Sequence, residues 1–179
     1  MEQTETLFNG EYLRVRHRRG WEYAERTNAS AAVIIVAVTP EDRLLLVEQF
    51  RIPVDATSIE MPAGLVGDLD HGESIEQAAV RELLEETGWH AGRIEYLMSG
   101  PSSSGMSNEQ VAFVRALDLV RLGPGGGDAS EDIIVHEVPR NEAAAWLDAH
   151  RRGGYSIDPK LYAGLYFIEH NPDGSRARD

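Results

Sequence analysis

Residues Pro62 to Trp89, PAGLVGDLDHGESIEQAAVRELLEETGW, decide the fold that we predict for this chain. Ser74, followed three residues later by Gln77, matches a capping box at the start of a helix. Gly88 suits the left-handed position that closes a helix. The pattern predicts a helix from about Ile75 to Thr87, with glycine-rich turns at both ends.

Three glutamates lie on one side of this predicted helix. At about 100° per residue, Glu82, Glu85 and Glu86 fall within one arc. Ala78 and Ala79 leave this acidic side uncluttered. The opposite side carries the apolar stripe that we expect to face the core, which consists of Val80, Leu83 and Leu84.

The acidic side needs countercharge. Glu85 and Glu86 repel each other and face the negative end of the helix dipole, and the single cation of the helix, Arg81, precedes them. A merely solvated acidic face is the alternative, but such a helix would be stabilised by Lys or Arg in its last turn. The pattern therefore indicates a site for a hard cation, Mg²⁺ or alternatively Mn²⁺.

The spacing Gly67-x5-Glu73-x7-Arg81-Glu82-Leu83-x-Glu85-Glu86-x-Gly88-Trp89 matches the complete Nudix box, and the chain resembles the Nudix hydrolase superfamily. The resemblance implies an α/β/α sandwich on a mixed β-sheet, with an antiparallel β extension over residues 1–30. It also implies two or more ions per site, held by the Ala63 carbonyl, Glu82, Glu85, Glu86 and Glu131. The residues expected to brace the loop and orient the carboxylates are Gly67, Glu73, Arg81 and Gly88.

The flanking residues narrow the resemblance. The run VEQFR, which ends at Arg51, and the following Glu60-Met61-Pro62-Ala63-Gly64 are similar to ADP-ribose pyrophosphatases. This implies that Arg51 and Glu60 lie on the substrate side. The loop at 99–109 resembles the Ser-Pro-Gly…Glu loop of the same relatives, which implies the same for Glu109, and their use of N-terminal aromatics implies that Trp21 contacts the base. Trp21 could equally be an ordinary sheet aromatic. Unlike in those relatives, Gly64 lies nine positions before Glu73, as if about three residues were inserted within 67–72.

A glycine-rich stretch from Leu122 to Asp132 is predicted to be a mobile loop that carries an acid over the substrate. By the resemblance, Glu131 activates water or binds a metal ion, and Asp128 is the second candidate, with Glu109 next. Glu85 is also expected to be catalytic. A solvated loop acid is the alternative.

Composition bounds the remaining possibilities. A net charge of −13 opposes binding to a nucleic acid polymer. The longest wholly apolar run, residues 31–38, is too short to span a bilayer, so no membrane partner is expected. The start, MEQTETLFNGEY, lacks the regions of a secretory signal, and there is no cysteine; we expect a cytoplasmic protein.

The rest of the chain predicts a single domain, residues 1–179. We expect a hairpin around Asn9-Gly10, a strand at 31–38 with 43–47 as its neighbour, strands at 93–98, 110–116 and 133–138, helices at 141–150 and 159–170, and a disordered tail at 171–179. The expected activity is hydrolysis of the diphosphate bond of a nucleotide sugar, such as ADP-ribose to AMP and ribose 5-phosphate, by a homodimer. GDP-mannose is the alternative substrate, and a sensor that binds without cutting is the alternative class.

Overall fold

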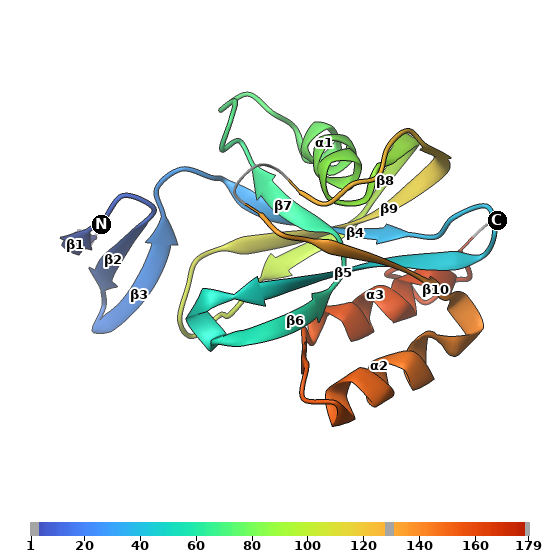
Figure 1. Cartoon of the computed structure of the whole chain (residues 1–179). Helices are drawn as coiled ribbons and strands as arrows, with labels where there is room; N and C mark the ends of the chain where they lie inside the picture. The colour runs from blue at the N-terminus through green and yellow to red at the C-terminus, as the bar shows by residue number, and fades with distance from the viewer. Residues whose placement is uncertain (1–3, 128–130, 178–179) are drawn as a thin grey trace.

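The computed structural model describes residues 4–127 and 131–177. Two four-stranded sheets lie between one helix on one side and two helices on the other, as Figure 1 shows. These helices are α1 (Ile75–Thr87), α2 (Ala143–Arg152) and α3 (Lys160–Glu169), and the short 3-10 turns are η1 (Ile52–Val54) and η2 (Arg140–Glu142). The predicted α/β/α sandwich is confirmed.

The strands divide into three sheets. The first has the order β7-β4-β9-β8, from β7 (Ala63–Val66), β4 (Ala31–Ala37), β9 (Gln110–Arg121) and β8 (Trp89–Pro101). The second has the order β10-β5-β6-β11, from β10 (Ile134–Pro139), β5 (Arg43–Arg51), β6 (Ala56–Glu60) and β11 (Ser156–Ile157). The third is the predicted N-terminal extension, β1 (Glu5–Asn9), β2 (Leu13–Arg18) and β3 (Trp21–Arg26), which stands apart from the body in Figure 1.

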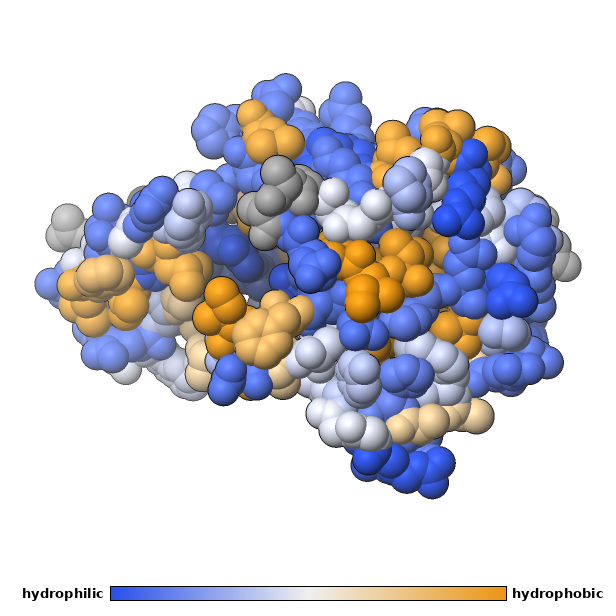
Figure 2. All heavy atoms as spheres, viewed as in Figure 1, coloured by the Kyte–Doolittle hydropathy of each residue, from blue (hydrophilic) through white to orange (hydrophobic). Residues whose placement is uncertain are grey.

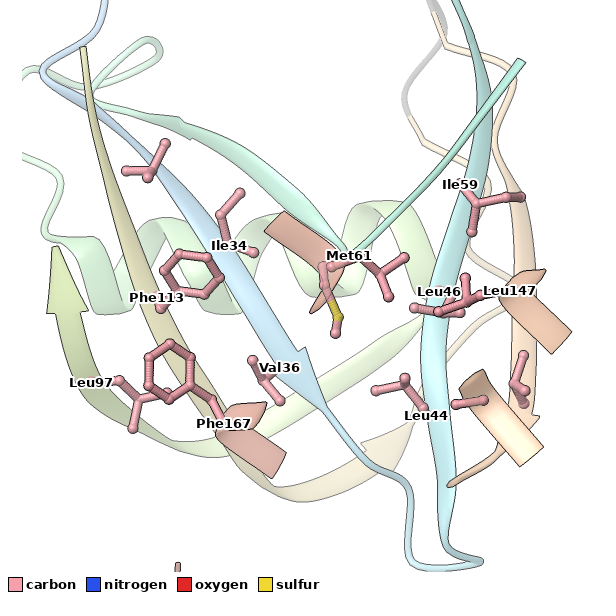
Figure 3. Close-up of a cluster of buried hydrophobic side chains, with 14 residues drawn as sticks. Ile34, Val36, Leu44, Leu46, Ile59, Met61, Leu97, Phe113, Leu147 and Phe167 are labelled. Carbon is pink, nitrogen blue, oxygen red and sulfur yellow. The ribbon is translucent and has the colours of Figure 1, made fainter. Parts of the chain in front are cut away.

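Strand β4 is buried on both faces because its side chains are apolar at every position. Ile34 and Val36 belong to the cluster beneath α2 and α3 that Figure 3 shows, where the rings of Phe113 and Phe167 lie 5.4 Å apart. Val33 and Ile35 point the other way and pack with α1. The continuous apolar run was therefore correctly interpreted as a strand covered on both sides.

The expected pairing of residues 43–47 with β4 was wrong. Strand β4 pairs with β7 and β9, whereas β5 pairs with β10 and β6. The connection at Thr39–Asp42 allows a single bridge, Val38 to Leu44, before the chain crosses to the second sheet. Asp42 has a φ of 59°, which turns the chain sharply at this point. Close spacing in sequence therefore did not mean pairing.

The N-terminal sheet is joined to the body through the loop that connects β8 and β9. The backbone N–H of Ala24 donates to the carbonyl of Met106 over 2.8 Å, and the N–H of Asn108 donates to the carbonyl of Ala24 over 3.3 Å. This junction brings the end of β3, including Arg26, to the start of β9.

The C-terminal segment differs from the disordered tail that we expected. Over its described part, residues 171–177, the chain turns back on α3: the N–H of Asn171 donates to the carbonyl of Ser175, and the N–H of Ala177 to the carbonyl of Glu169, each over 2.8 Å. The polar side chains of Asn171, Asp173 and Ser175 form hydrogen bonds within this turn. In the described part of the chain, no helix has the length and apolar character needed to span a membrane.

Candidate active site

Helix α1 has the ends that the sequence predicts. The Ser74 Oγ accepts from the N–H of Gln77 over 3.2 Å, and the Gln77 side chain accepts from the N–H of Ser74 over 2.9 Å. Gly88 closes the helix with a φ of 75°. The predicted bounds, Ile75 to Thr87, are confirmed.

The helix is rotated relative to the predicted core stripe. Ala78, Ala79 and Leu83 are fully buried, whereas Val80 and Leu84 are only half-buried. The alanines, which we placed on an uncluttered acidic side, are the residues that let α1 pack closely on the first sheet. As a consequence, the acidic side turns partly inward, and Glu86 is only 3% exposed.

A cleft of about 570 Å³ lies along this inward acidic edge. Figure 2 shows a hollow between the N-terminal sheet and the body of the molecule whose visible walls are mostly hydrophilic. We call the acidic residues of α1 together with β7 the acidic wall of the cleft, and the cations paired with carboxylates that line it elsewhere the opposite wall. The charged residues that line the cleft are Arg26, Arg51, Glu60, Asp68, Arg81, Glu82, Glu85, Glu86, Glu109, Glu131, Asp158 and Lys160.

Strand β7 holds two of the glutamates in place. The N–H of Ala63 donates to the Glu86 carboxylate over 3.0 Å. Gly64 lies so close to Glu82 that an added Cβ would meet its carboxylate carbon at 1.9 Å. Gly64 is therefore a residue whose lack of a side chain makes room for an acid, although the sequence indicated only a turn there.

Arg81 links the loop that precedes α1 to the acidic edge. Its guanidinium donates to Glu73 over 2.9 Å, to Glu82 over 2.8 Å and to Glu85 over 3.2 Å. It also reaches Asp68 over 3.3 Å, within the stretch that carries the apparent insertion. The N–H of Gly67 donates to Glu73 over 3.2 Å, and Gly67 has a φ of 82°. The loop at 67–72 is thus closed by the residues expected to brace it.

The donor set suits a hard cation. Burial raises the pKa of Glu82 to about 7 despite the opposing charge of Arg81. Burial also raises the pKa of Glu86 well above its usual value, despite the hydrogen bond from Ala63. Two desolvated carboxylates with incomplete compensation, beside a third that is exposed, are oxygen donors that Mg²⁺ or Mn²⁺ would bind.

The carboxylates are neighbours, but they do not form a preassembled cage. Among the described residues, no three His, Cys, Asp or Glu side chains converge closely enough to hold one ion. Arg81 Nη1 instead contacts both Glu82 and Glu85. The same arginine that braces the loop thus occupies the oxygens that a cation would take.

The opposite wall contains ion pairs, and the sequence predicted only part of it. Arg51 donates to Glu60 through Nε over 2.9 Å and through Nη2 over 2.7 Å. Burial opposes ionisation of Glu60, but the hydrogen bond and charge of Arg51 outweigh it and lower the pKa of Glu60. Glu109 is paired with Arg26, which the sequence did not single out.

Three further lining residues were missed, namely Asp68, Asp158 and Lys160. They are charged residues in polar stretches, where exposure to solvent is the usual expectation. One signal was available for Lys160, because it is the single lysine of the sequence.

The glycine-rich stretch is anchored where we expected mobility. The N–H of Gly126 donates to the carbonyl of Glu86 over 2.8 Å, and the N–H of Gly127 to the carbonyl of Glu85 over 3.1 Å. A Cβ on Gly125 would meet the backbone of Thr87 at 2.4 Å. The glycines therefore permit close contact between two backbones, and residues 122–127 satisfy carbonyls at the end of α1 that the helix leaves unpaired.

Of the two candidate acids in this loop, the structure places only Glu131 relative to the cleft. Glu131 lines the cleft, and its charge helps raise the pKa of Glu86 after the larger effects of burial, so these carboxylates are close. Asp128 lies outside the described residues.

Trp21 lies on β3 with 64% of its surface exposed. It lines a separate hollow, together with Arg16, Arg18 and Ser104, on the side of the N-terminal sheet. Within one chain, the structure does not bring Trp21 to the acidic cleft.

Comparison with known proteins agrees with this fold. A sequence profile described as the NUDIX domain matches residues 28–157. The chain therefore belongs to the NUDIX domain family.

Two curated relatives and one solved structure are similar to the chain. It is 33% identical over 121 residues to a methanol dehydrogenase activator of Bacillus methanolicus, covering 67% of this chain and 64% of the relative. It is 40% identical over 119 residues to an ADP-ribose pyrophosphatase of Bacillus subtilis, covering 66% of this chain and 63% of the relative. The match thus spans less than two thirds of either relative. A crystal structure of an ADP compounds hydrolase shares the fold, with a TM-score of 0.70 at 22% identity over 93% of this chain and 89% of that chain.

The close contact at Gly125 gives a testable prediction. Gly125→Ala should lower the free energy of unfolding by about 2–4 kcal/mol, because it adds a backbone clash to the cost of a positive φ. Gly20→Ala is the matched control: Gly20 has a similar φ of 79°, but its Cβ would meet nothing within 4 Å. This control should lose only about 1 kcal/mol. Urea denaturation measures both, and equal losses would show that the contact with α1 is unimportant.

Proposed function

We propose that the chain is a metal-dependent hydrolase that cleaves the diphosphate bond of a nucleotide sugar, with ADP-ribose giving AMP and ribose 5-phosphate. The observation that carries the proposal is the cleft itself, in which buried carboxylates of α1 face the Arg51–Glu60 pair. Membership of the NUDIX domain family supports the reaction class. The similarity to an ADP-ribose pyrophosphatase supports the choice of substrate.

The acidic wall holds the cations in this proposal. Glu82, Glu85 and Glu86, with the Ala63 carbonyl and Glu131, would bind two or more Mg²⁺ ions, with Mn²⁺ as an alternative. Bound there, the ions would neutralise the diphosphate and acidify an attacking water. Arg81 and Glu73 keep the carboxylates and the preceding loop in register. Without such countercharge, a chain with a net charge of −13 would repel the substrate.

Arg51 positions the diphosphate from the opposite wall. Its contacts with Glu60 use one N–H of Nε and one of Nη2, so the N–H groups of Nη1 and the second N–H of Nη2 can donate to a phosphate oxygen. Glu60 fixes the direction of the guanidinium, and its own burial makes that pairing important.

Glu131 serves as the base that accepts the proton of the attacking water. It lines the cleft near Glu86, and Gly127 packs against its side chain, since a Cβ there would meet the Glu131 Cβ at 2.7 Å. Asp128 is the second candidate for this role. We further propose that the protein acts in the cytoplasm as a homodimer.

Arg51 variants test the site and the substrate together. Arg51→Ala should lower kcat/KM for ADP-ribose by roughly ten- to a hundred-fold, because it removes a charge-assisted contact. Arg51→Lys should retain more kcat/KM than Arg51→Ala but less than the parent, since lysine keeps the charge and loses the planar fork. Arg51→Ala with Glu60→Gln is the control for the unpaired Glu60 that the single change leaves behind. Steady-state kinetics of the parent and of each variant, with ADP-ribose and with GDP-mannose, gives the kcat/KM values to compare.

Two results of that experiment would contradict the proposal. A parent protein that hydrolyses GDP-mannose faster than ADP-ribose would overturn the choice of substrate. A parent that releases no phosphate-ester product from either compound would overturn the reaction class.

Glu131→Gln tests the assignment of the base. At saturating substrate it should lower kcat by about a hundred-fold or more while changing KM little, because a general base acts in the chemical step. Asp128→Asn, measured in parallel, should retain kcat within about threefold. The reverse order would move the base to Asp128. If neither variant changes kcat, Glu109 becomes the candidate.

A further inference from the structure

The wall opposite α1 carries two ion pairs that the proposed chemistry does not use. Lys160 Nζ lies 2.5 Å from the Asp158 carboxylate, and Arg26 is paired with Glu109. All four residues line the cleft, and the side chain of Lys160 is 39% exposed. Both cations reach solvent, which screens the attraction within each pair, so stability alone is a weak reason for placing the pairs there.

The fold brings these residues together from distant parts of the sequence. Strand β11 runs parallel to β6 with Ile157 opposite Ile59, so Asp158 follows beside Glu60. The N–H of Asp158 donates to the carbonyl of Ile59 over 3.1 Å, and the N–H of Lys160 donates to Asp158 Oδ1 over 2.9 Å. Asp158 is therefore fixed by the sheet, and it fixes Lys160 in turn.

Lys160 acts on both neighbouring acids. Burial opposes ionisation of Glu109, but hydrogen bonds from Arg26 and Ser102, together with the charges of Arg26 and Lys160, outweigh it and lower the Glu109 pKa. In the same way, Lys160 adds to the effect of Arg51 in lowering the pKa of Glu60. The ammonium is thus close enough to act on the carboxylates of both the Arg51–Glu60 pair and the Arg26–Glu109 pair.

The charges on this wall cancel, and this limits what it can bind. Two cations, Arg26 and Lys160, stand beside two carboxylates, Glu109 and Asp158. With no bound cation expected beside these pairs, a phosphate there would be attracted by each cation and repelled by its partner carboxylate. A neutral group rich in hydroxyls fits, because each hydroxyl can donate to a carboxylate and accept from an ammonium or guanidinium.

We propose that Asp158 and Lys160, together with Arg26 and Glu109, bind the hydroxyl groups of the sugar beyond the diphosphate. This inference rests on the proposed function and identifies the part of the cleft that selects a neutral sugar. Arg26, Asp158 and Lys160 lie outside residues 28–157, the part that the family profile matches, so this wall is built largely by the N-terminal extension and the start of α3.

Variants of the pair test the proposal with two substrates. The first is ADP-ribose, and the second is the methyl ester of the terminal phosphate of ADP, which keeps the diphosphate diester and replaces the sugar by a methyl group. Lys160→Met and Asp158→Asn should each raise KM for ADP-ribose about tenfold or more, through loss of a charged hydrogen bond. On the methyl ester, kcat/KM should change less than about twofold.

Arg152→Met and Asp148→Asn are the matched controls, because Arg152 and Asp148 form an exposed ion pair over 2.8 Å on α2 that does not line the cleft. These two variants should leave KM and kcat/KM unchanged for both substrates. Equal losses on both substrates, or no loss on ADP-ribose, would overturn the role of Lys160 while leaving the hydrolase intact. A parent protein that cleaves neither substrate would instead contradict the proposed function.

The single lysine allows a second test that needs neither metal nor turnover. Periodate-oxidised ADP-ribose carries aldehydes in place of the sugar diols, and reduction with cyanoborohydride fixes it to a nearby amine. Peptide mapping should find the adduct on Lys160, intact ADP-ribose should protect it, and Lys160→Arg should abolish it. Periodate-oxidised AMP, which carries the dialdehyde only on the adenosine side, should label Lys160 at least about fivefold less. Equal labelling by both reagents, or labelling of the α-amino group alone, would contradict the assignment.

Discussion

The burial of Glu82 and Glu86 along one edge of α1 is the constraint on which the rest of the site depends. A carboxylate taken out of water is costly unless charge or hydrogen bonds compensate it, and burial raises the pKa of both residues. Strand β7 supplies the Ala63 N–H and the space beside Gly64. Arg81 supplies part of the charge, and the remaining imbalance is what a divalent cation would offset.

The C-terminal end of α1 is a second source of instability, because negative charge and unpaired carbonyls gather there, and the glycine-rich segment pairs some of these carbonyls. Glu85 and Glu86 lie in the last turn, where the helix dipole disfavours negative charge. The N–H groups of Gly126 and Gly127 point at the carbonyls of these same two residues, so they satisfy that end of the helix. Gly126 and Gly127 are therefore fixed to the acidic helix that carries the proposed cation ligands.

The sequence predicted features that local chemistry determines. The caps of α1 follow from Ser74, Gln77 and Gly88, and the burial of β4 follows from its unbroken apolar run. The rotation of α1 could not be predicted, because Ala78 and Ala79 are compatible with either side of the helix. Glycines 125–127 likewise suit a mobile loop or a close contact, and only the neighbouring backbone decides between them.

Features that residues from distant segments form together could not be predicted from the sequence. Residues 26, 109 and 160 meet at one wall because β3 joins the loop before β9, and β11 pairs with β6. The transfer of β5 to a second sheet has the same origin, since pairing with β10 and β6 is a property of the whole fold. The result is a cleft with two different walls, an acidic one suited to cations and a charge-balanced one suited to a neutral group.

The buried carboxylates of α1 should be held at a free-energy cost that a divalent cation removes. The most direct measurement is the free energy of unfolding with and without Mg²⁺, at equal ionic strength, for the parent and for Glu86→Gln, which keeps an acceptor for the Ala63 N–H. Mg²⁺ at a hundred times its dissociation constant should stabilise the parent by about 2.7 kcal/mol. Metal-free Glu86→Gln should be at least as stable as the parent and should gain much less from Mg²⁺. An identical response of the two proteins to Mg²⁺, or none in the parent, would show that these carboxylates do not hold the cation.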